Sequence, residues 1–91
     1  MKEAPVEKHL TTVVKALGGR AVKLNPLGWV GIPDRLVILP HGVVIFVELK
    51  RPKGGVVSAK QGAWYTWLSD RGHAVEVMNT KDMIDEYFKK F

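Results

Sequence analysis

The sequence predicts an α/β fold in which a mixed central sheet is flanked by helices. Three patterns carry this expectation: an apolar helical stripe near the N-terminus, a group of three short strand candidates, and a helix–strand–helix succession towards the C-terminus. The elements follow the order α-β-β-β-α-β-α. Because a helix separates the third strand from the fourth, we expect these two strands to be parallel, which makes the sheet mixed.

The first predicted helix begins near Pro5, a residue that suits a first helical turn, and ends at the glycine pair Gly18-Gly19. Its apolar residues recur at i, i+4, i+7, i+8 and i+11, which is the spacing of one helical face. These residues are Val6, Leu10, Val13, Val14 and Leu17. We expect this face to cover the sheet.

Three strand candidates follow, at about Arg20 to Leu24, Asp34 to Leu39 and Val43 to Lys50. The tripeptide PHG predicts a three-residue hairpin loop between the second and the third. The apolar run VVIFV, at Val43 to Val47, indicates that the third strand is buried on both faces. The loop between the first two strands, NPLGWVGIP, is rich in glycine and proline.

The second half of the chain predicts a helix, a strand and a final helix. Ser58 opens the helix, which runs to about Arg71 and stops at Gly72. His73 to Met78 follow as the fourth strand, and Thr80 caps the closing helix. One face of that helix is apolar and aromatic: Met83, Ile84, Tyr87, Phe88 and Phe91.

Composition narrows the class of protein. Ninety-one residues suffice for one domain, spanning 1–91, and the hydrophobic share of 46% and charged share of 25% are ordinary for a globular chain. We find no apolar run near the ~20 residues of a membrane span and no signal peptide. The absence of cysteine fits a cytoplasmic location. The net charge of +5 favours a polyanionic partner such as nucleic acid.

The predicted hairpin brings two carboxylates together. If Leu39 pairs with Val43, paired residue numbers sum to 82, and Asp34 lies opposite Glu48. Directly opposed side chains share one face, about 5 Å apart, and Lys50 projects from the same face. Two carboxylates this close repel each other, whereas Mg²⁺ or Mn²⁺ stabilises them. This register therefore predicts a metal site, and a slip of one residue would separate the pair.

Two motifs resemble a known nuclease family. Pro33-Asp34, followed after thirteen residues by Glu48-Leu49-Lys50, resembles the PD-(D/E)XK signature. The segments GIPDRLVI, VIFVELK, SAKQGAWYTWL and RGHAVEVM resemble the virus-type replication-repair nuclease (VRR-NUC) family over nearly the whole chain. The resemblance implies a restriction-endonuclease-like core with an additional C-terminal helix. It also implies hydrolysis of DNA phosphodiester bonds to 5′-phosphate and 3′-hydroxyl ends, with Mg²⁺ or Mn²⁺ held by Asp34, Glu48 and the main-chain carbonyl of Leu49.

The same resemblance implies roles for two further charged residues. Lys50 would stabilise the charge of the transition state and orient or deprotonate the attacking water; the alternative is a solvated lysine in a basic segment. Glu7, at the edge of the first helix's apolar stripe, would reach the metal, although the helix dipole also favours an acid in a first turn. The alternative for Asp34 is a turn residue after Pro33, and the alternative for Glu48 is an exposed strand end paired with a basic side chain. Neither alternative explains why the two carboxylates face each other.

Gln61 and Tyr65 lie one turn apart on the second predicted helix. The segment SAKQ, from Ser58 to Gln61, is a capping box in which the glutamine bonds back to the cap residue. The resemblance instead places Gln61 beside the carboxylates as a catalytic, water-positioning group. The Gln61-x-x-x-Tyr65 spacing is similar to that of RecB-like exonucleases, so Tyr65 would face the DNA, or else pack against the sheet.

Basic and aromatic residues provide candidate DNA contacts. Trp64 and Trp67 lie at helical spacing, which favours packing in a core or an interface over stacking on bases. Trp29, in the glycine-rich loop, could wedge against a base or contact another protein. Phosphate contacts position a nucleic acid without reading its sequence, and five residues could make them, or else belong to a solvated surface: Arg20, Lys23, Arg35, Lys53 and Lys60.

Compact members of the family resemble Holliday junction resolvases. That likeness implies a four-way junction or other branched DNA as substrate, and a homodimer with two sites about one symmetry axis. The aromatic C-terminal helix and the two helix tryptophans offer apolar surface for such a dimer. Two alternatives stay open: a monomeric nuclease that processes flaps or ends, and a module that binds branched DNA without cutting it. We expect no membrane partner and a location in the cytoplasm of a bacterial or phage-infected cell.

Overall fold

The computed structural model describes residues 5–24, 28–51 and 55–91. The α-β-β-β-α-β-α order is confirmed, and each strand is one residue shorter than predicted, since Leu24, Asp34, Lys50 and His73 lie just outside the strands. The elements are α1 (Pro5–Ala16), β1 (Arg20–Lys23), β2 (Arg35–Leu39), β3 (Val43–Leu49), α2 (Ala59–Asp70), β4 (Ala74–Met78) and α3 (Lys81–Phe88).

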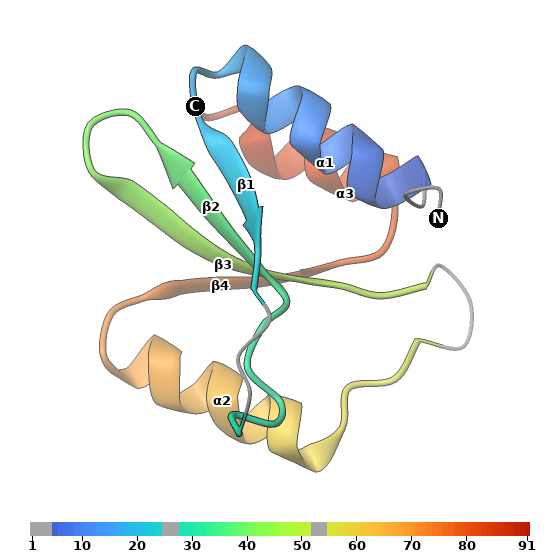
Figure 1. Ribbon diagram of the computed structural model, residues 1–91, viewed down its shortest axis with the longest axis vertical. Coiled ribbons are helices and arrows are strands. Elements are labelled where there is room, and N and C mark those ends of the chain that lie inside the picture. The colour runs from blue at the N-terminus through green and yellow to red at the C-terminus, as the bar shows by residue number, and fades with distance from the viewer. Residues whose placement is uncertain (1–4, 25–27, 52–54) are drawn as a thin grey trace.

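The strands form one mixed sheet in the order β1-β2-β3-β4. The pairs β1–β2 and β2–β3 are antiparallel, and β3 pairs with β4 in parallel, as the connection through α2 predicted. Helices α1 and α3 lie side by side on one face of the sheet, and α2 lies on the other (Figure 1). Among the described residues, no helix is long and apolar enough to cross a bilayer.

The hairpin register agrees with the prediction. Arg35 pairs with Val47 at one end and Leu39 with Val43 at the other, so paired residue numbers sum to 82. The connecting loop reverses at His41, whose φ of 66° lies in the left-handed region that tight hairpins use. Because side chains alternate along a strand, odd-numbered residues of β2 and β3 face α1 and α3, and even-numbered residues face α2.

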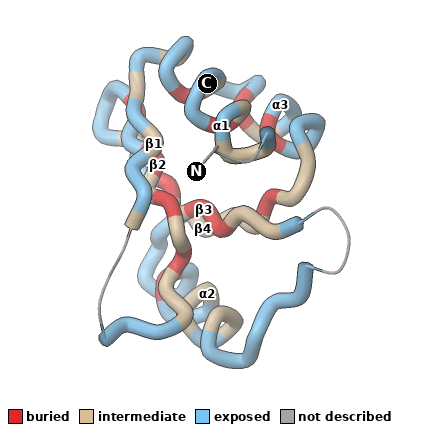
Figure 2. The backbone as a smooth tube through the Cα atoms, turned by 45° about the vertical axis from the view of Figure 1, so that its right-hand side comes forward, coloured by how far each residue is buried: buried red, intermediate tan, exposed pale blue. Residues whose placement is uncertain are grey.

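The core lies between the sheet and the α1/α3 pair. Alternate residues of β2 and β3, with Met78 of β4, supply one side of it, and residues of α1 and α3 supply the other (Figure 2). Burial of each such side chain contributes about 1.5–3 kcal/mol, so this layer holds the hairpin rigidly. Its members are Leu10, Val14, Val37, Leu39, Ile45, Val47, Met78, Ile84 and Phe88.

Helix α2 covers its face of the sheet much less completely. Leu68 is the one buried residue in this fully described helix, and Trp67 is 48% exposed. Of the two predictions for Trp67, a place in the core is therefore wrong, and a place in an interface stays a prediction. The aromatic face of α2 turns instead towards the loop before β2, where the Trp64 indole N–H donates to the carbonyl of Val30.

Candidate active site

Asp34 and Glu48 lie at the open end of the β2–β3 hairpin. Asp34 immediately precedes β2, and Glu48 is the penultimate residue of β3. Continuing the observed register by one pair places them opposite each other, on the face that α2 covers. The main-chain N–H of Leu49 donates to Asp34 Oδ1 at 3.1 Å, which ties the two strand ends together. Glu48 is only 5% exposed, so its carboxylate lies inside this site.

Both carboxyl groups resist ionisation. Burial, followed by the nearby charge of Asp34, raises the pKa of Glu48 to about 7, and the Lys50 ammonium only partly opposes this. Burial also raises the pKa of Asp34, against the lowering effects of the Leu49 N–H and of Arg35. Burial and the repulsion between the two carboxylates therefore both favour the protonated forms. Ionised, the pair lowers the stability of the fold.

Lys50 lies on the same face as Glu48, as predicted from the alternation along β3. Its Nζ atom is 3.9 Å from Glu48 Oε2 and donates a 2.7 Å hydrogen bond to Gln61 Oε1. The ammonium is therefore held between the hairpin and the start of α2. It is positioned to act on a negatively charged group bound beside Glu48.

Gln61 makes the predicted capping contacts and also contacts Lys50 of the candidate site. Its Oε1 atom accepts from the Ser58 N–H at 3.0 Å, and its own N–H donates to Ser58 Oγ at 3.2 Å, which completes the capping box. The same Oε1 atom also accepts from Lys50. One side chain thus begins α2 and anchors Lys50, so the helix start and the candidate site share a hydrogen-bond network.

Tyr65 points inward from α2 rather than outward to solvent. Its hydroxyl is buried and has no hydrogen-bond partner among the described residues. Burial first, and then the charges of Glu48 and Asp34, raise its pKa. The hydroxyl therefore lies near both carboxylates, inside the site, which agrees with the expectation that Gln61 and Tyr65 share a side of α2; contact of Tyr65 with DNA stays a prediction.

Arg35 occupies a different place from the one predicted. It is 5% exposed, and its guanidinium lies between two carboxylates, 3.0 Å from Glu7 Oε1 and 3.3 Å from Asp34 Oδ2. A direct phosphate contact by Arg35 does not fit this position. Glu7 is therefore joined to the site through Arg35. Among the described residues, no group of three or more His, Cys, Asp or Glu side chains is placed to hold one metal ion. The sequence did indicate the burial of Arg35, because Arg35 lies two residues from Val37 on β2 and so shares its inward-facing side of the sheet.

The remaining predicted phosphate contacts are distributed unequally. Lys23 ends β1 opposite Arg35, close to the candidate site, whereas Arg20 pairs with Ile38 towards the hairpin loop. Lys60 is exposed in the first turn of α2. Lys53 lies outside the described residues.

The mixed sheet, with an aspartate and a Glu-x-Lys at adjoining strand ends, is the core of a PD-(D/E)XK-type nuclease. The VRR-NUC domain model matches residues 6–82, and the chain belongs to this family. A protein named "Putative nuclease p44", from Acyrthosiphon pisum secondary endosymbiont phage 1, is 41% identical over 83 residues, or 91% of this chain and 88% of that protein. A solved structure titled "VRR_NUC domain" matches with a TM-score of 0.87 and 34% identity, over 94% of this chain and 92% of that chain. The chain is a nuclease domain with DNA as its substrate.

Proposed function

We propose that this chain is a metal-dependent, structure-selective DNA endonuclease that acts as a homodimer on branched DNA, with the four-way junction as preferred substrate. We assign this activity to the cytoplasm of a bacterial or phage-infected cell. One observation supports the proposal above all others: Asp34 and Glu48 lie together at the hairpin end with Lys50 beside them. A protein that only bound DNA would have no reason to keep two repelling carboxylates there.

The oxygen atoms at this site fit Mg²⁺ or Mn²⁺. Asp34 and Glu48 offer carboxylates and Leu49 offers a main-chain carbonyl, which are the hard donors that these ions prefer. Burial is the main cause of the raised pKa of both carboxyl groups, and a bound cation would favour their ionised forms. The unpartnered, buried Tyr65 hydroxyl also suits a site completed by a hydrated ion. When bound, the ion supplies polarisation of a phosphate oxygen and acidification of the attacking water.

The chain's own side chains would orient the phosphate and stabilise its charge. The hydrogen bond from Lys50 to Gln61 fixes the orientation of the ammonium group towards the site. There it would stabilise the negative charge that develops on the phosphate oxygens. Gln61 would act as a positioning residue, through Lys50. Arg35, tied to Glu7, would hold Asp34 from the other side of the sheet.

A homodimer would let one protein make the paired cuts that resolve a junction. The part of the sheet that α2 leaves open carries three exposed apolar side chains on neighbouring strands, Val22, Ile38 and Val44. Grouped apolar side chains on an exposed sheet favour burial against a partner surface. A second copy pairing through this face would remove them from water and place two active sites in one particle.

A cleavage assay tests the activity. Labelled four-way junction, flap, splayed arm and plain duplex are each incubated with Mg²⁺, Mn²⁺ or EDTA, and we expect paired nicks in the junction with either metal only. Asp34→Asn is the inactive control, because its amide oxygen can still accept from the Leu49 N–H and so preserves the strand ends. Glu76→Gln removes a carboxylate elsewhere on the sheet and should leave cutting unchanged.

Light scattering completes the test, with twice the chain mass of 10.2 kDa expected. A monomer that cuts only flaps or ends would replace the junction proposal with end processing. Tight, salt-sensitive DNA binding with no cutting in either metal would reject the enzyme and leave a binding module.

A further inference from the structure

The three tryptophans of the chain line a single hollow beside α2. Trp64 is the middle one, with ring centroids 5.9 Å from Trp29 and 5.7 Å from Trp67. Both pairs meet edge to face, at interplanar angles of 73° and 70°, so no two of the rings are stacked in parallel. With Ala63 they enclose a hollow of about 460 Å³, a size typical of small-ligand sites.

The wall of this hollow formed by the loop is fixed to the helix. Gly31 has a φ of +95°, and a Cβ atom there would lie 2.8 Å from the main-chain carbon of Lys60. Only glycine therefore lets the loop approach the first turn of α2 so closely. The hydrogen bond from Trp64 to the Val30 carbonyl adds a second attachment. Trp29 is thereby held opposite α2, although it is 61% exposed.

The hollow and the candidate active site are built on the same two segments. Trp29 precedes Asp34 by five residues on one segment, and Trp64 and Trp67 follow Gln61 by three and six residues on the other. At about 1.5 Å of rise per residue, these two tryptophans lie about 4.5 and 9 Å beyond Gln61 along the helix axis. Phosphates of one DNA strand repeat about every 3.4 Å along the helix axis. For a DNA strand that runs along α2, a group in the hollow would thus lie about one to three nucleotides from a phosphate at Lys50.

We propose that this tryptophan hollow binds an unpaired nucleobase of the DNA substrate, next to the phosphate that is cut. The inference rests on the proposed nuclease function. An exposed indole stacks on the flat face of any base, and Trp29 is 61% exposed. Positive charge for the adjoining phosphates is at hand, since the Arg71 guanidinium lies 3.9 Å from the Trp67 ring centroid and Lys60 is exposed nearby.

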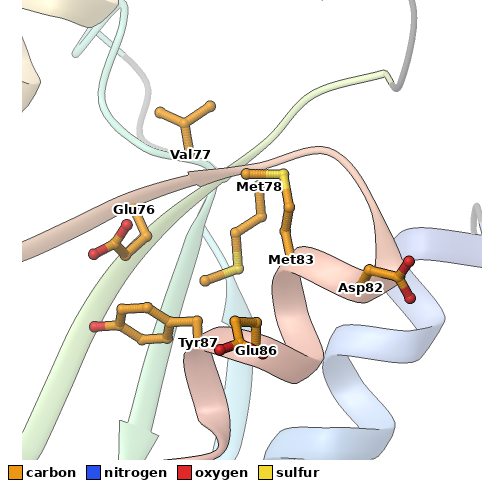
Figure 3. Close-up of a pocket in the computed structure, with 7 residues that line it drawn as sticks. All are labelled: Glu76, Val77, Met78, Asp82, Met83, Glu86 and Tyr87. Carbon is orange, nitrogen blue, oxygen red and sulfur yellow. The ribbon is translucent and has the colours of Figure 1, made fainter.

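A second hollow in the described structure shows the opposite chemistry. It lies between β4 and α3, where Met78 and Tyr87 are accompanied by the carboxylates of Glu76 and Glu86 (Figure 3). Carboxylates repel phosphates, so this surface is unsuited to DNA. Of the two, the tryptophan hollow is the one that combines apolar ring faces with neighbouring cations.

The dimensions of the tryptophan hollow favour a base over a second protein chain. A stable protein interface buries about 800 Å² on each partner, whereas one fully buried aromatic side chain supplies about 150–250 Å². The two exposed tryptophans fall well short of that area. A single planar base matches them, and it is presented only where strands part, at junctions, flaps and bulges. Stacking is tolerant of base identity, so the hollow would select DNA by structure and not by sequence.

Intrinsic fluorescence reads this hollow directly, because it contains every tryptophan of the chain. The probes are a duplex with one unpaired thymine, the same duplex with an abasic residue at that position, and the fully paired duplex, all in EDTA. We expect quenching by the first probe only. Trp29→Ala should weaken binding of that probe about tenfold and leave the paired duplex unchanged. Met83→Ala, which removes an exposed apolar side chain from α3, should change neither.

Three results would overturn the inference. The first is equal quenching by all three probes. The second is that Trp29→Ala and Trp67→Leu both bind the probe with the unpaired thymine as tightly as the native protein does. The third is an emission shift that depends on protein concentration alone and that Trp29→Ala abolishes. The last result would make the hollow an interface between copies. A cleavage assay with Mn²⁺ distinguishes failure of the base-binding inference from failure of the nuclease proposal. Cutting without selective quenching rejects only the base site, and selective quenching without cutting rejects only the nuclease.

Discussion

The substitution Glu48→Gln tests whether the paired carboxylates exist to hold a cation. Without metal, burial and repulsion by Asp34 raise the pKa of Glu48 from 4.5 to about 7. The folded protein therefore binds this proton more tightly than the unfolded chain does. It follows that Glu48 does not destabilise the fold below about pH 4.5, that the destabilisation grows as the pH rises towards 7, and that it is complete above that pH.

The magnitude follows from the two pKa values. One pKa unit corresponds to about 1.4 kcal/mol, and the two values differ by between two and three units, so ionised Glu48 lowers the free energy of unfolding by about 3–4 kcal/mol near pH 8. Glutamine keeps the shape of the side chain and carries no charge. In EDTA, Glu48→Gln should therefore raise the free energy of unfolding by about this amount near pH 8. Near pH 4.5, where the native carboxyl is already protonated in the fold, the two proteins should differ little.

Urea denaturation followed by tryptophan fluorescence measures this difference at both pH values. Repeating it with Mn²⁺ should stabilise the native protein and not the variant, because only the native site binds the ion tightly. Cleavage of DNA should be lost in the variant. Glu76→Gln, on the neighbouring strand β4, is the matched control and should change neither stability nor cleavage. A Glu48→Gln protein that is less stable at both pH values, or that still cuts DNA, would refute the reasoning.

Five further substitutions separate the roles of neighbouring residues. Lys50→Met keeps side-chain volume without charge and should slow single-turnover cleavage about 10²–10³-fold with little change in DNA affinity; an unchanged rate would remove Lys50 from the chemistry. Gln61→Ala should lower both stability, by about 1 kcal/mol, and the cleavage rate, whereas Ser58→Ala should lower stability alone. Equal cleavage losses in those two variants would make Gln61 a cap residue only. Arg35→Met should destabilise the fold by about 3 kcal/mol without altering the salt dependence of DNA binding. Lys23→Met should instead reduce the slope of log affinity against log salt by about 0.9. A reduced slope in Arg35→Met together with an unchanged slope in Lys23→Met would show that Arg35 contacts phosphate.

The hairpin illustrates how far local sequence patterns can specify a site. A three-residue loop and an apolar strand determine the pairing of β2 with β3, because both act over neighbouring residues. That pairing alone predicted the proximity of Asp34 and Glu48 and the shared face of Lys50. The parallel direction of β4 relative to β3 was also predicted locally, since the helix between them permits a parallel pair.

The contacts that the sequence did not predict depend on how separate elements dock. Alternation with Val37 and Leu39 would have turned Arg35 inward, but its pairing with Glu7 requires knowing where α1 lies on the sheet. The same holds for α2, which meets the loop through Trp64 and leaves much of its sheet face open. Side chains at helical spacing indicate a shared face, and they do not indicate which surface that face meets.

The charges around the candidate site account for a link between metal and substrate. Glu7, Asp34 and Glu48 carry three negative charges when ionised, against one positive charge each on Arg35 and Lys50, so the site is locally negative in a chain whose net charge is +5. A phosphate therefore binds more weakly at this point without a divalent cation than with one. Glu48→Gln removes one of the three negative charges. It should therefore bind DNA more tightly than the native protein in EDTA while being unable to cut it, because the charge that attracts the metal is also the charge that repels the substrate.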